Sequence, residues 1–218
     1  MTLSTVQELP NRVDATGDEA TIGSTTGVDA NDPERLTHSG TAHYAYFPGT
    51  ADNNLTVPDE AALDITDDLE IVFRLAPDDW TPAAAETIVN KSSSTYAARI
   101  QTSGDVRLYI NNVGYDSTIA PTITDGVALW IKITRDRSTG DIDFYTAADQ
   151  ATEPSSWDTL GTTVAGVTDA IATGAADFYI GTNNSGTAPL QGIIQRVIVR
   201  STIGGAAILD VNLPVDID

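Results

Sequence analysis

The sequence predicts an all-β protein built from two packed antiparallel sheets. Three observations carry this prediction: apolar and polar residues alternate from residue 43 onward, turn-forming residues separate the short runs, and no long helical pattern appears. About ten short strands with turns between them are typical of a sandwich or a barrel. At 218 residues the chain is long enough for one domain with a sizeable core.

Residues 1–36 are predicted to form an extended arm ahead of the folded domain, which covers residues 37–218. The apolar side chains of the arm follow neither the strand period nor the helix period, and Pro10 and Pro33 oppose a continuous helix. Such a segment cannot offset the ~1–2 kcal/mol per residue that backbone ordering costs. We therefore expect the arm to order only against a partner, as an anchor in an assembly.

The individual strands follow from alternation and from the turn residues that end each run. In the predicted strand at residues 69–75, Phe73 and Leu75 flank Arg74, so one side of the strand is predicted to face the core. Only residues 82–86 and 169–172 have weak helical character. The predicted strands cover residues 44–47, 69–75, 87–91, 96–101, 106–110, 127–133, 142–144, 178–180, 193–199 and 206–213.

Charge and composition exclude several classes of protein. The chain has 31 acidic and 11 basic residues, a net charge of −20, which repels nucleic acid and anionic lipid. The longest apolar run, residues 127–131, is far shorter than the ~20 residues of a membrane span. Without cysteine there is no disulfide, thiolate metal site or cysteine nucleophile.

The order of the segments resembles laminin-G-like, concanavalin-A-like jelly rolls. The likeness begins with HYAYFPGTADNNLTVPDEAALDITDDLEIVFRL at residues 43–75 and continues with TGDIDFY at 139–145. It ends with IGTNNSGTAPLQGIIQRVIVR at 180–200, and in all it covers roughly residues 40–213. The resemblance implies a two-sheet antiparallel jelly-roll sandwich, and it specifies architecture better than function.

Within this group the chain is most similar to domains in virion proteins of tailed bacteriophages. The first residues, MTLSTVQELPNR, lack the features of a signal peptide, whereas secreted laminin-G domains more often carry a signal and a disulfide. The resemblance implies a non-enzymatic minor tail or capsid decoration protein, made in the host cytoplasm and exposed on the phage head or tail. Its expected partners are other virion proteins and copies of itself, as in a trimer. The alternative is a carbohydrate-binding module of a bacterial or archaeal surface protein.

The search for catalytic residues predicts no enzyme activity. Glycoside hydrolases need two carboxylates on one face, and none of the seven glutamates lies in an alternating acidic pattern. Asp141 and Asp143 do share a face, and we interpret them as a solvated hairpin edge. Neither His38 nor His43 accompanies a Gly-x-Ser-x-Gly elbow, which the chain lacks.

Calcium is the one cofactor that the resemblance suggests, although none is required. Laminin-G-like domains often hold Ca²⁺ with loop aspartates and asparagines, which supply the oxygen ligands that this ion prefers. Asp52 and Asn53 occupy the corresponding early turn, and Asn183 lies in a comparable late loop. The alternative is that these residues simply form turns without a metal.

A glycan-binding face is predicted from the side chains that point away from the core. Exposed aromatic rings stack on sugars, while Arg and Lys donate hydrogen bonds to hydroxyl or carboxylate groups. The resemblance suggests the concave face of a sheet as the ligand site and a host-surface glycan as the ligand. The alternatives are that the strands lie in different sheets, or that a loop or another subunit covers the face. The candidate ligand-binding residues are Arg74, Arg99, Arg107, Tyr109, Trp130, Lys132 and Tyr145.

Overall fold

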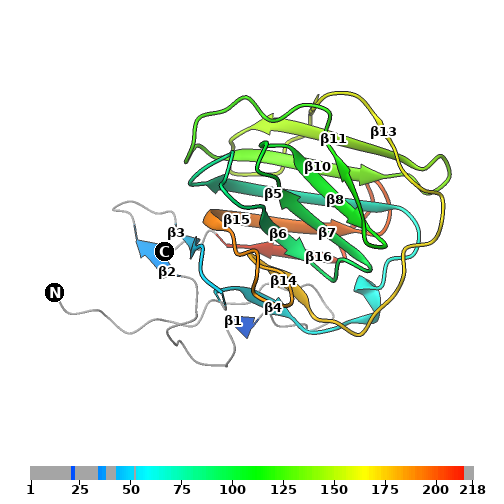
Figure 1. The fold of residues 1–218 in the computed structure, drawn as a ribbon, viewed down its shortest axis with the longest axis horizontal. Helices are drawn as coiled ribbons and strands as arrows, with labels where there is room; N and C mark the ends of the chain where they lie inside the picture. The colour runs from blue at the N-terminus through cyan, green and yellow to red at the C-terminus, as the bar shows by residue number, and fades with distance from the viewer. Residues whose placement is uncertain (1–20, 23–33, 38–42, 52, 214–218) are drawn as a thin grey trace.

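The computed structural model describes residues 21–22, 34–37, 43–51 and 53–213, and it confirms the two antiparallel sheets (Figure 1). Sheet A has seven strands in the order β1-β4-β14-β6-β7-β8-β9. Sheet B has nine: seven in the order β12-β11-β10-β5-β15-β3-β2, with β13 beside β11 and β16 beside β15. In Figure 1 strands β6, β7 and β8 of sheet A cross in front of β5 and β15 of sheet B.

The strands of sheet A are β1 (Thr21–Ile22), β4 (Leu55–Val57), β6 (Glu86–Asn90), β7 (Tyr96–Ile100), β8 (Val106–Ile110), β9 (Val113–Asp116) and β14 (Phe178–Ile180). The strands of sheet B are β2 (Glu34–Thr37), β3 (His43–Pro48), β5 (Leu69–Pro77), β10 (Leu129–Arg135), β11 (Asp141–Ala148), β12 (Asp158–Thr159), β13 (Val164–Ala165), β15 (Gln191–Arg200) and β16 (Leu209–Asn212). One short 3-10 helix, η1 (Ala61–Leu63), completes the elements that the described ranges contain. Neither 82–86 nor 169–172 is helical, and no helix in the described ranges is long and apolar enough to cross a membrane.

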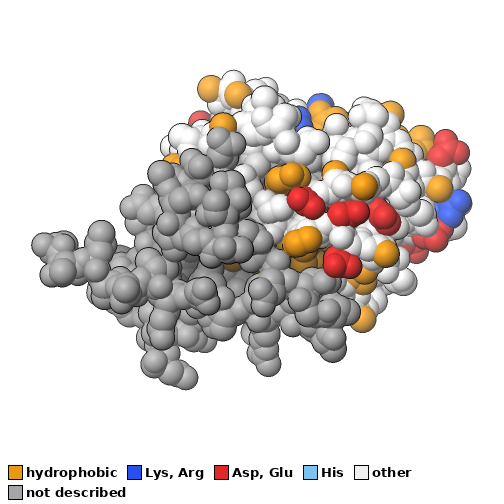
Figure 2. Space-filling view, turned by 90° about the horizontal axis from the view of Figure 1, so that it is seen from below, with side chains coloured by type: hydrophobic (Ala, Val, Ile, Leu, Met, Phe, Trp, Pro, Cys, Tyr) orange, Lys and Arg blue, Asp and Glu red, His pale blue; other side chains and the backbone are white. Residues whose placement is uncertain are grey.

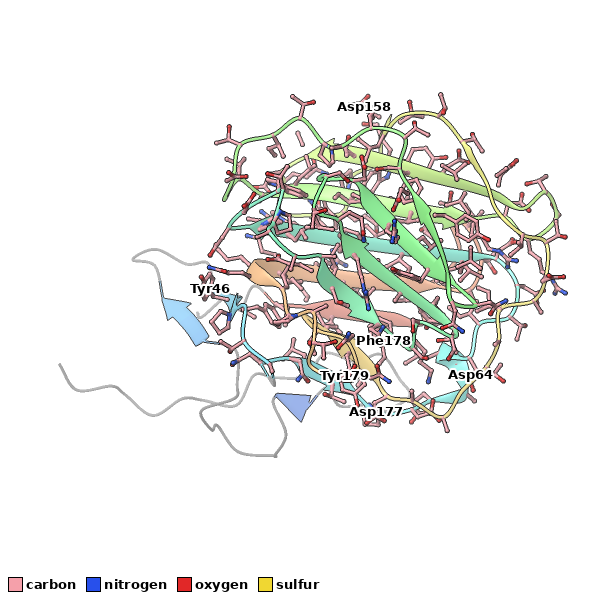
Figure 3. All side chains as sticks on the ribbon, viewed as in Figure 1. Tyr46, Asp64, Asp158, Asp177, Phe178 and Tyr179 are labelled. Atoms are coloured by element: carbon pink, nitrogen blue, oxygen red, sulfur yellow. The ribbon has the colours of Figure 1, made fainter. Side chains whose placement is uncertain are left out.

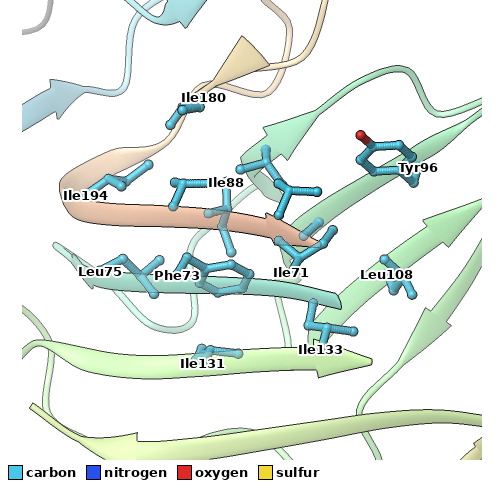
Figure 4. Packing of buried hydrophobic residues seen from close by; sticks show 14 of the residues in the cluster. Ile71, Phe73, Leu75, Ile88, Tyr96, Leu108, Ile131, Ile133, Ile180 and Ile194 are labelled. Atoms are coloured by element: carbon cyan, nitrogen blue, oxygen red, sulfur yellow. The ribbon is translucent and has the colours of Figure 1, made fainter. Parts of the chain in front are cut away.

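The core lies between the sheets and is filled by the inward half of each alternating strand (Figure 4). Ile71 and Phe73 of β5 are fully buried, as is Leu108 of β8, which confirms the predicted alternation. Tyr96 of β7 is also buried, and its hydroxyl donates a hydrogen bond to the carbonyl of Leu63 in η1 at 2.9 Å. The buried tyrosine thereby fixes the connection between β4 and β5 against sheet A.

The outer face of sheet B is covered in its middle, because a second apolar cluster lies there. Val72, Trp130 and Ile198 form this cluster, and Trp157 packs against it. Trp157 belongs to residues 149–157, which follow β11 and which we call the strap. Because the strap lies over this part of the sheet, β5 is buried on both faces, whereas simple alternation predicts burial on one.

The N-terminal segment contributes a short strand to each sheet. β1 pairs with β4 at the edge of sheet A, and β2 pairs with β3 at the edge of sheet B. The predicted boundary between residues 36 and 37 therefore falls inside β2. The rest of the predicted arm, residues 1–20 and 23–33, lies outside the described residues.

Candidate functional site

The seven predicted ligand-binding residues do not share one face, so that part of the expectation is wrong. Arg99, Arg107 and Tyr109 lie on β7 and β8 in sheet A. The other four lie on β5, β10 and β11 in sheet B. Alternation tells which side chains point outward from a strand, but it does not tell which of two sheets the strand joins. The four residues of sheet B are Arg74, Trp130, Lys132 and Tyr145.

Trp130 is buried in the second apolar cluster, on the outer face of sheet B, and cannot stack on a ligand. Its side chain is 0% exposed, and its Nε1 donates a hydrogen bond to the carbonyl of Gln150 in the strap at 2.9 Å. The expectation that Trp130 is an exposed aromatic is therefore wrong. Its direction relative to the strand is as predicted, but the strap covers it.

The other three predicted ligand-binding residues of sheet B, Arg74, Lys132 and Tyr145, take part in contacts that hold the strap in place. Arg74 forms a two-pronged ion pair with Asp149, with N–O distances of 2.6 and 3.1 Å. The ammonium of Lys132 lies 4.6 Å from the ring centre of Tyr145 and 4.7 Å from that of Trp157. Burial lowers the pKa of Lys132, although nearby carboxylates act in the opposite direction. These side chains are thus occupied by intramolecular contacts.

The outer face of sheet A carries a continuous row of side chains with a tyrosine toward each end. Strand pairing sets Tyr179 of β14 opposite Asn90 of β6, Asn90 opposite Ala97 of β7, and Ala97 opposite Tyr109 of β8. Both tyrosines are partly exposed, whereas Ala97 between them is buried. Figure 3 shows Tyr179 beside Asp177, near the border of the molecule opposite Asp158. We call these four residues the tyrosine row: Tyr179, Asn90, Ala97 and Tyr109.

A second row runs beside the first and contains the basic residues. Pairing sets Thr87 of β6 opposite Arg99, Arg99 opposite Arg107, and Arg107 opposite Asp116 of β9. Arg107 pairs with Asp116 through two hydrogen bonds of 2.5 and 2.6 Å, which raise the pKa of its guanidinium. A side chain at Gly114 would meet Arg107, because a Cβ there would lie 2.8 Å from Arg107 Cδ. Glycine at this position therefore lets Arg107 lie flat against β9.

Several side chains in these two rows carry buried polar atoms without hydrogen-bond partners. Thr87 Oγ1, both amide atoms of Asn90 and Arg99 Nε are buried and have no hydrogen-bond partner. Together with Gln101 Nε2, one residue beyond β7, they make up five of the ten such atoms in the described part of the chain. Each buried polar group without a partner costs about 1–3 kcal/mol, so folded proteins rarely collect them in one place. We call Thr87, Asn90 and Arg99 the polar floor.

Sequence reasoning found Arg99, Arg107 and Tyr109 but missed Thr87, Asn90 and Tyr179. Alternation around Phe178 and Ile180 could have placed Tyr179 on the outer face. Thr87 and Asn90 could not be found in this way, because a β-bulge between Thr87 and Val89 shifts the register of β6. The polar floor depends on this irregularity.

The predicted calcium residues are only partly described. The Asn183 Oδ1 accepts hydrogen bonds from the amides of Ser185 and Thr187, and its Nδ2 donates to Thr187 Oγ1 at 2.9 Å. Asn53 is nearly buried and donates a hydrogen bond to the Thr50 hydroxyl, whereas Asp52 lies outside the described residues. Asn183 therefore fits a turn-forming residue better than an ion ligand, because its oxygen is already used by its own loop.

Asp141 and Asp143, the acidic residues considered for catalysis, both lie on β11. Asp143 accepts a hydrogen bond from the Thr163 hydroxyl at 2.6 Å, at the edge where β11 meets β13. Over the described ranges, no three side chains of the His, Cys, Asp or Glu types come together as a metal cluster. The absence of enzyme activity stays a prediction.

Comparison with known proteins identifies the fold. No protein-family model matches the sequence, and no curated protein matches it either. Among solved structures, the binding domain of botulinum neurotoxin DC in complex with SialylT superposes with a TM-score of 0.55 at 10% identity, covering 85% of this chain and 43% of that one. Domains LG4-5 of the mouse laminin α1 chain give a TM-score of 0.51 at 13% identity, with 86% and 45% covered.

A third structure, a candidate carbohydrate binding protein from Bacteroides ovatus, gives a TM-score of 0.52 at 15% identity, covering 73% of this chain and 44% of that one. The chain spans less than half the length of each of these three structures. Identities this low establish a shared fold only. The chain shares the two-sheet jelly-roll fold of these structures, as its sequence predicts.

Proposed function

We propose that this chain is a non-catalytic carbohydrate-binding module whose ligand lies on the outer face of sheet A. The observation that carries the proposal is the polar floor, where buried donors and acceptors without partners lie between two partly exposed tyrosines. A sugar offers both hydroxyl groups for such atoms and an apolar ring face for an aromatic side chain. Small-molecule sites commonly combine these two features.

The residues of the face have complementary parts in this proposal. Tyr179 supplies a flat surface for a sugar ring, while Asn90 and Thr87 can donate to or accept from hydroxyl groups. The Tyr109 ring instead supports the guanidinium groups of Arg99 and Arg107, whose Cζ atoms lie 5.0 and 5.5 Å from the ring centre. Because the polar floor is buried, a ligand must displace the side chains above it before it gains these hydrogen bonds. The fold adds support, since the Bacteroides ovatus structure is named for carbohydrate binding and the botulinum domain was determined with SialylT.

A glycan array followed by titration calorimetry on the best ligand tests this proposal. Tyr179→Ala is expected to weaken binding by roughly tenfold or more, since one stacked aromatic ring contributes on that scale. Tyr109→Ala is expected to weaken binding as well, because it removes the ring on which Arg99 lies. Tyr145→Ala is the matched control, because it removes the same side chain from the outer face of sheet B and should leave binding unchanged. If no glycan is retained, or if Tyr145→Ala weakens binding as much as the other two variants, the proposal is wrong.

A place on a phage virion, as a minor tail or capsid decoration protein, stays a prediction from the sequence. The two roles are compatible, because a glycan-binding face on a virion protein would serve attachment to the host surface. Immunogold labelling of purified phage particles that encode this chain tests the virion role independently of any glycan.

A further inference from the structure

Arg99 differs from the other basic side chains that the structure describes. Arg135 donates to three backbone carbonyls, and Lys132 lies between two aromatic rings. Arg99 contacts the ring of Tyr109, with its Cζ 5.0 Å from the ring centre, but forms no ion pair with any described carboxylate. The described basic residues that do pair with carboxylates are Arg74, Lys91, Arg107, Arg137, Arg196 and Arg200.

An unpaired guanidinium is unexpected in a chain with 31 acidic residues and a net charge of −20. On the face drawn in Figure 2, acidic side chains gather between hydrophobic ones and the basic ones lie at the margin. Where carboxylates are this abundant, a cation is readily matched by an internal partner. Arg99 is instead held in position by Tyr109, with its Nε buried and unpartnered and with Thr87 opposite it in the neighbouring strand.

We propose that the missing partner of Arg99 is a carboxylate on the ligand, so that the module recognises an acidic sugar rather than a neutral one. This inference rests on the proposed function. The planar fork of a guanidinium matches a carboxylate through two parallel hydrogen bonds. The Thr87 hydroxyl and the Asn90 amide, both in the polar floor beside Arg99, supply further donors for the carboxylate or for hydroxyl groups of the same sugar.

Net charge makes this recognition selective. A surface with a net charge of −20 repels anions in general, so an acidic glycan gains affinity only where its carboxylate meets the guanidinium. Neutral sugars escape the repulsion but leave the polar floor and Arg99 without a charged partner. Sulfated sugars carry a tetrahedral anion that a guanidinium can also bind through two hydrogen bonds, so they are the competing ligands in the test.

The test uses oligogalacturonate, its methyl ester, a neutral oligogalactoside and a sulfated galactan, together with an array of other carboxylated glycans. The best carboxylated ligand is expected to bind at least about tenfold more tightly than its ester, because a charge-assisted pair is lost. Arg99→Gln should remove that preference, and Arg99→Lys should restore only part of it, since Lys keeps the charge but not the fork. Arg74→Gln, the same substitution on sheet B, should leave the preference intact.

The outcomes separate the two claims. Binding of ester and acid with equal affinity, or an unchanged preference in Arg99→Gln, overturns the inference while the carbohydrate-binding function stands. Preference for the sulfated galactan over every carboxylated glycan also overturns it. Binding to a poly-glutamate peptide with no binding to any glycan overturns both, as does complete absence of glycan binding. The melting temperature of each variant shows whether lost binding reflects unfolding instead.

Discussion

The ammonium of Lys132 lies 4.7 Å from the centre of the Trp157 ring, and this contact joins the strap to the middle of sheet B. Trp157 also packs on the outer cluster that contains Trp130. The strap is held at its other points by polar contacts from Asp149, Gln150 and Glu153. The middle of sheet B is therefore covered on its outer face, whereas the outer face of sheet A holds polar side-chain atoms without hydrogen-bond partners.

Trp157→Ala is expected to loosen the strap and to destabilise the fold by about 1–3 kcal/mol, since it removes a partly buried aromatic ring and a cation–π contact. Urea unfolding measures the loss. Trp80 and Trp130 are the tryptophans left in the variant, and Trp130 is the one beneath the strap, so their combined emission should shift to longer wavelength as water reaches Trp130. A variant with unchanged stability and with the emission expected for two buried tryptophans would contradict this account of the strap.

Thr87→Val should stabilise the fold while weakening glycan binding. The substitution is nearly isosteric and removes a buried hydroxyl that has no partner, so we expect a gain of about 1 kcal/mol. Thr95→Val is the matched control, because the Thr95 hydroxyl is equally buried but donates to the Ser92 carbonyl at 3.0 Å. The control should lose stability. A loss in both variants would show that the Thr87 hydroxyl has a structural role after all.

Lys91→Met is expected to destabilise the protein by about 2–4 kcal/mol. The Lys91 side chain is 0% exposed and forms an ion pair with Asp59, with Asp64 Oδ1 a further 3.8 Å from its Nζ. Removing the cation leaves two half-buried carboxylates without a counter-charge. Arg137→Met is the control, because its pair with Asp67 is exposed and should be worth at most about 1 kcal/mol. Equal losses in chemical denaturation would contradict the prediction.

Glu86→Gln is expected to change the pH dependence of stability. Burial, and secondarily the nearby Asp79 and Asp78, raise the pKa of Glu86 to about 7, although a hydrogen bond from the Gln191 amide acts the other way. In the parent protein, the folded state therefore retains the Glu86 proton to a higher pH than the unfolded state does. Stability from this group is therefore full below pH ~4.5 and is lost as the pH rises through about 7.

The variant should consequently be more stable than the parent at pH 8, by about 1 kcal/mol given the partial exposure of the side chain, and no more stable at pH 4. Melting curves at both pH values check this difference. Asp158→Asn removes one charge at an exposed position and controls for the change in net charge. If the advantage of Glu86→Gln at pH 8 is no larger than that of Asp158→Asn, the assignment fails.

The melting temperature of the parent should rise with NaCl up to moderate concentration, because the net charge of −20 repels itself and a Debye length near ~8–10 Å screens that repulsion. A fall over this range would contradict the prediction. Calcium at matched ionic strength should give the same rise, since Asn183 already uses its oxygen within its own loop. An additional rise with calcium would indicate a true calcium site.

The sequence predicts the long strands well because their side chains alternate over a sufficient length. β5 and β8 have five or more residues each, and their inward side chains are the predicted ones. Strands β9, β12 and β13 have two to four residues and were not predicted, because such short runs carry no period. Their pairing is decided by neighbouring strands.

The site was harder to predict, for two physical reasons. Trp130 points outward as alternation requires, but its burial depends on the strap, whose sequence has no strand pattern. Asn90 follows Ile88 and Val89 in β6, and the bulge between Thr87 and Val89 determines which face of the sheet the Asn90 side chain occupies. Both features arise from tertiary contacts, which single-strand periodicity does not record.

The position of β15 has a consequence for the order in which the protein can fold. This strand lies between β5 and β3, so that Val199 pairs with Ile71 although the two are more than a hundred residues apart. Contacts of such separation make folding slow, because a long loop must close before they form. During synthesis, the edges of β5 and β3 that pair with β15 keep unpaired backbone N–H and C=O groups until residue 200 has left the ribosome. A nascent chain that is halted before β15 cannot complete sheet B, so we expect it to depend on chaperones.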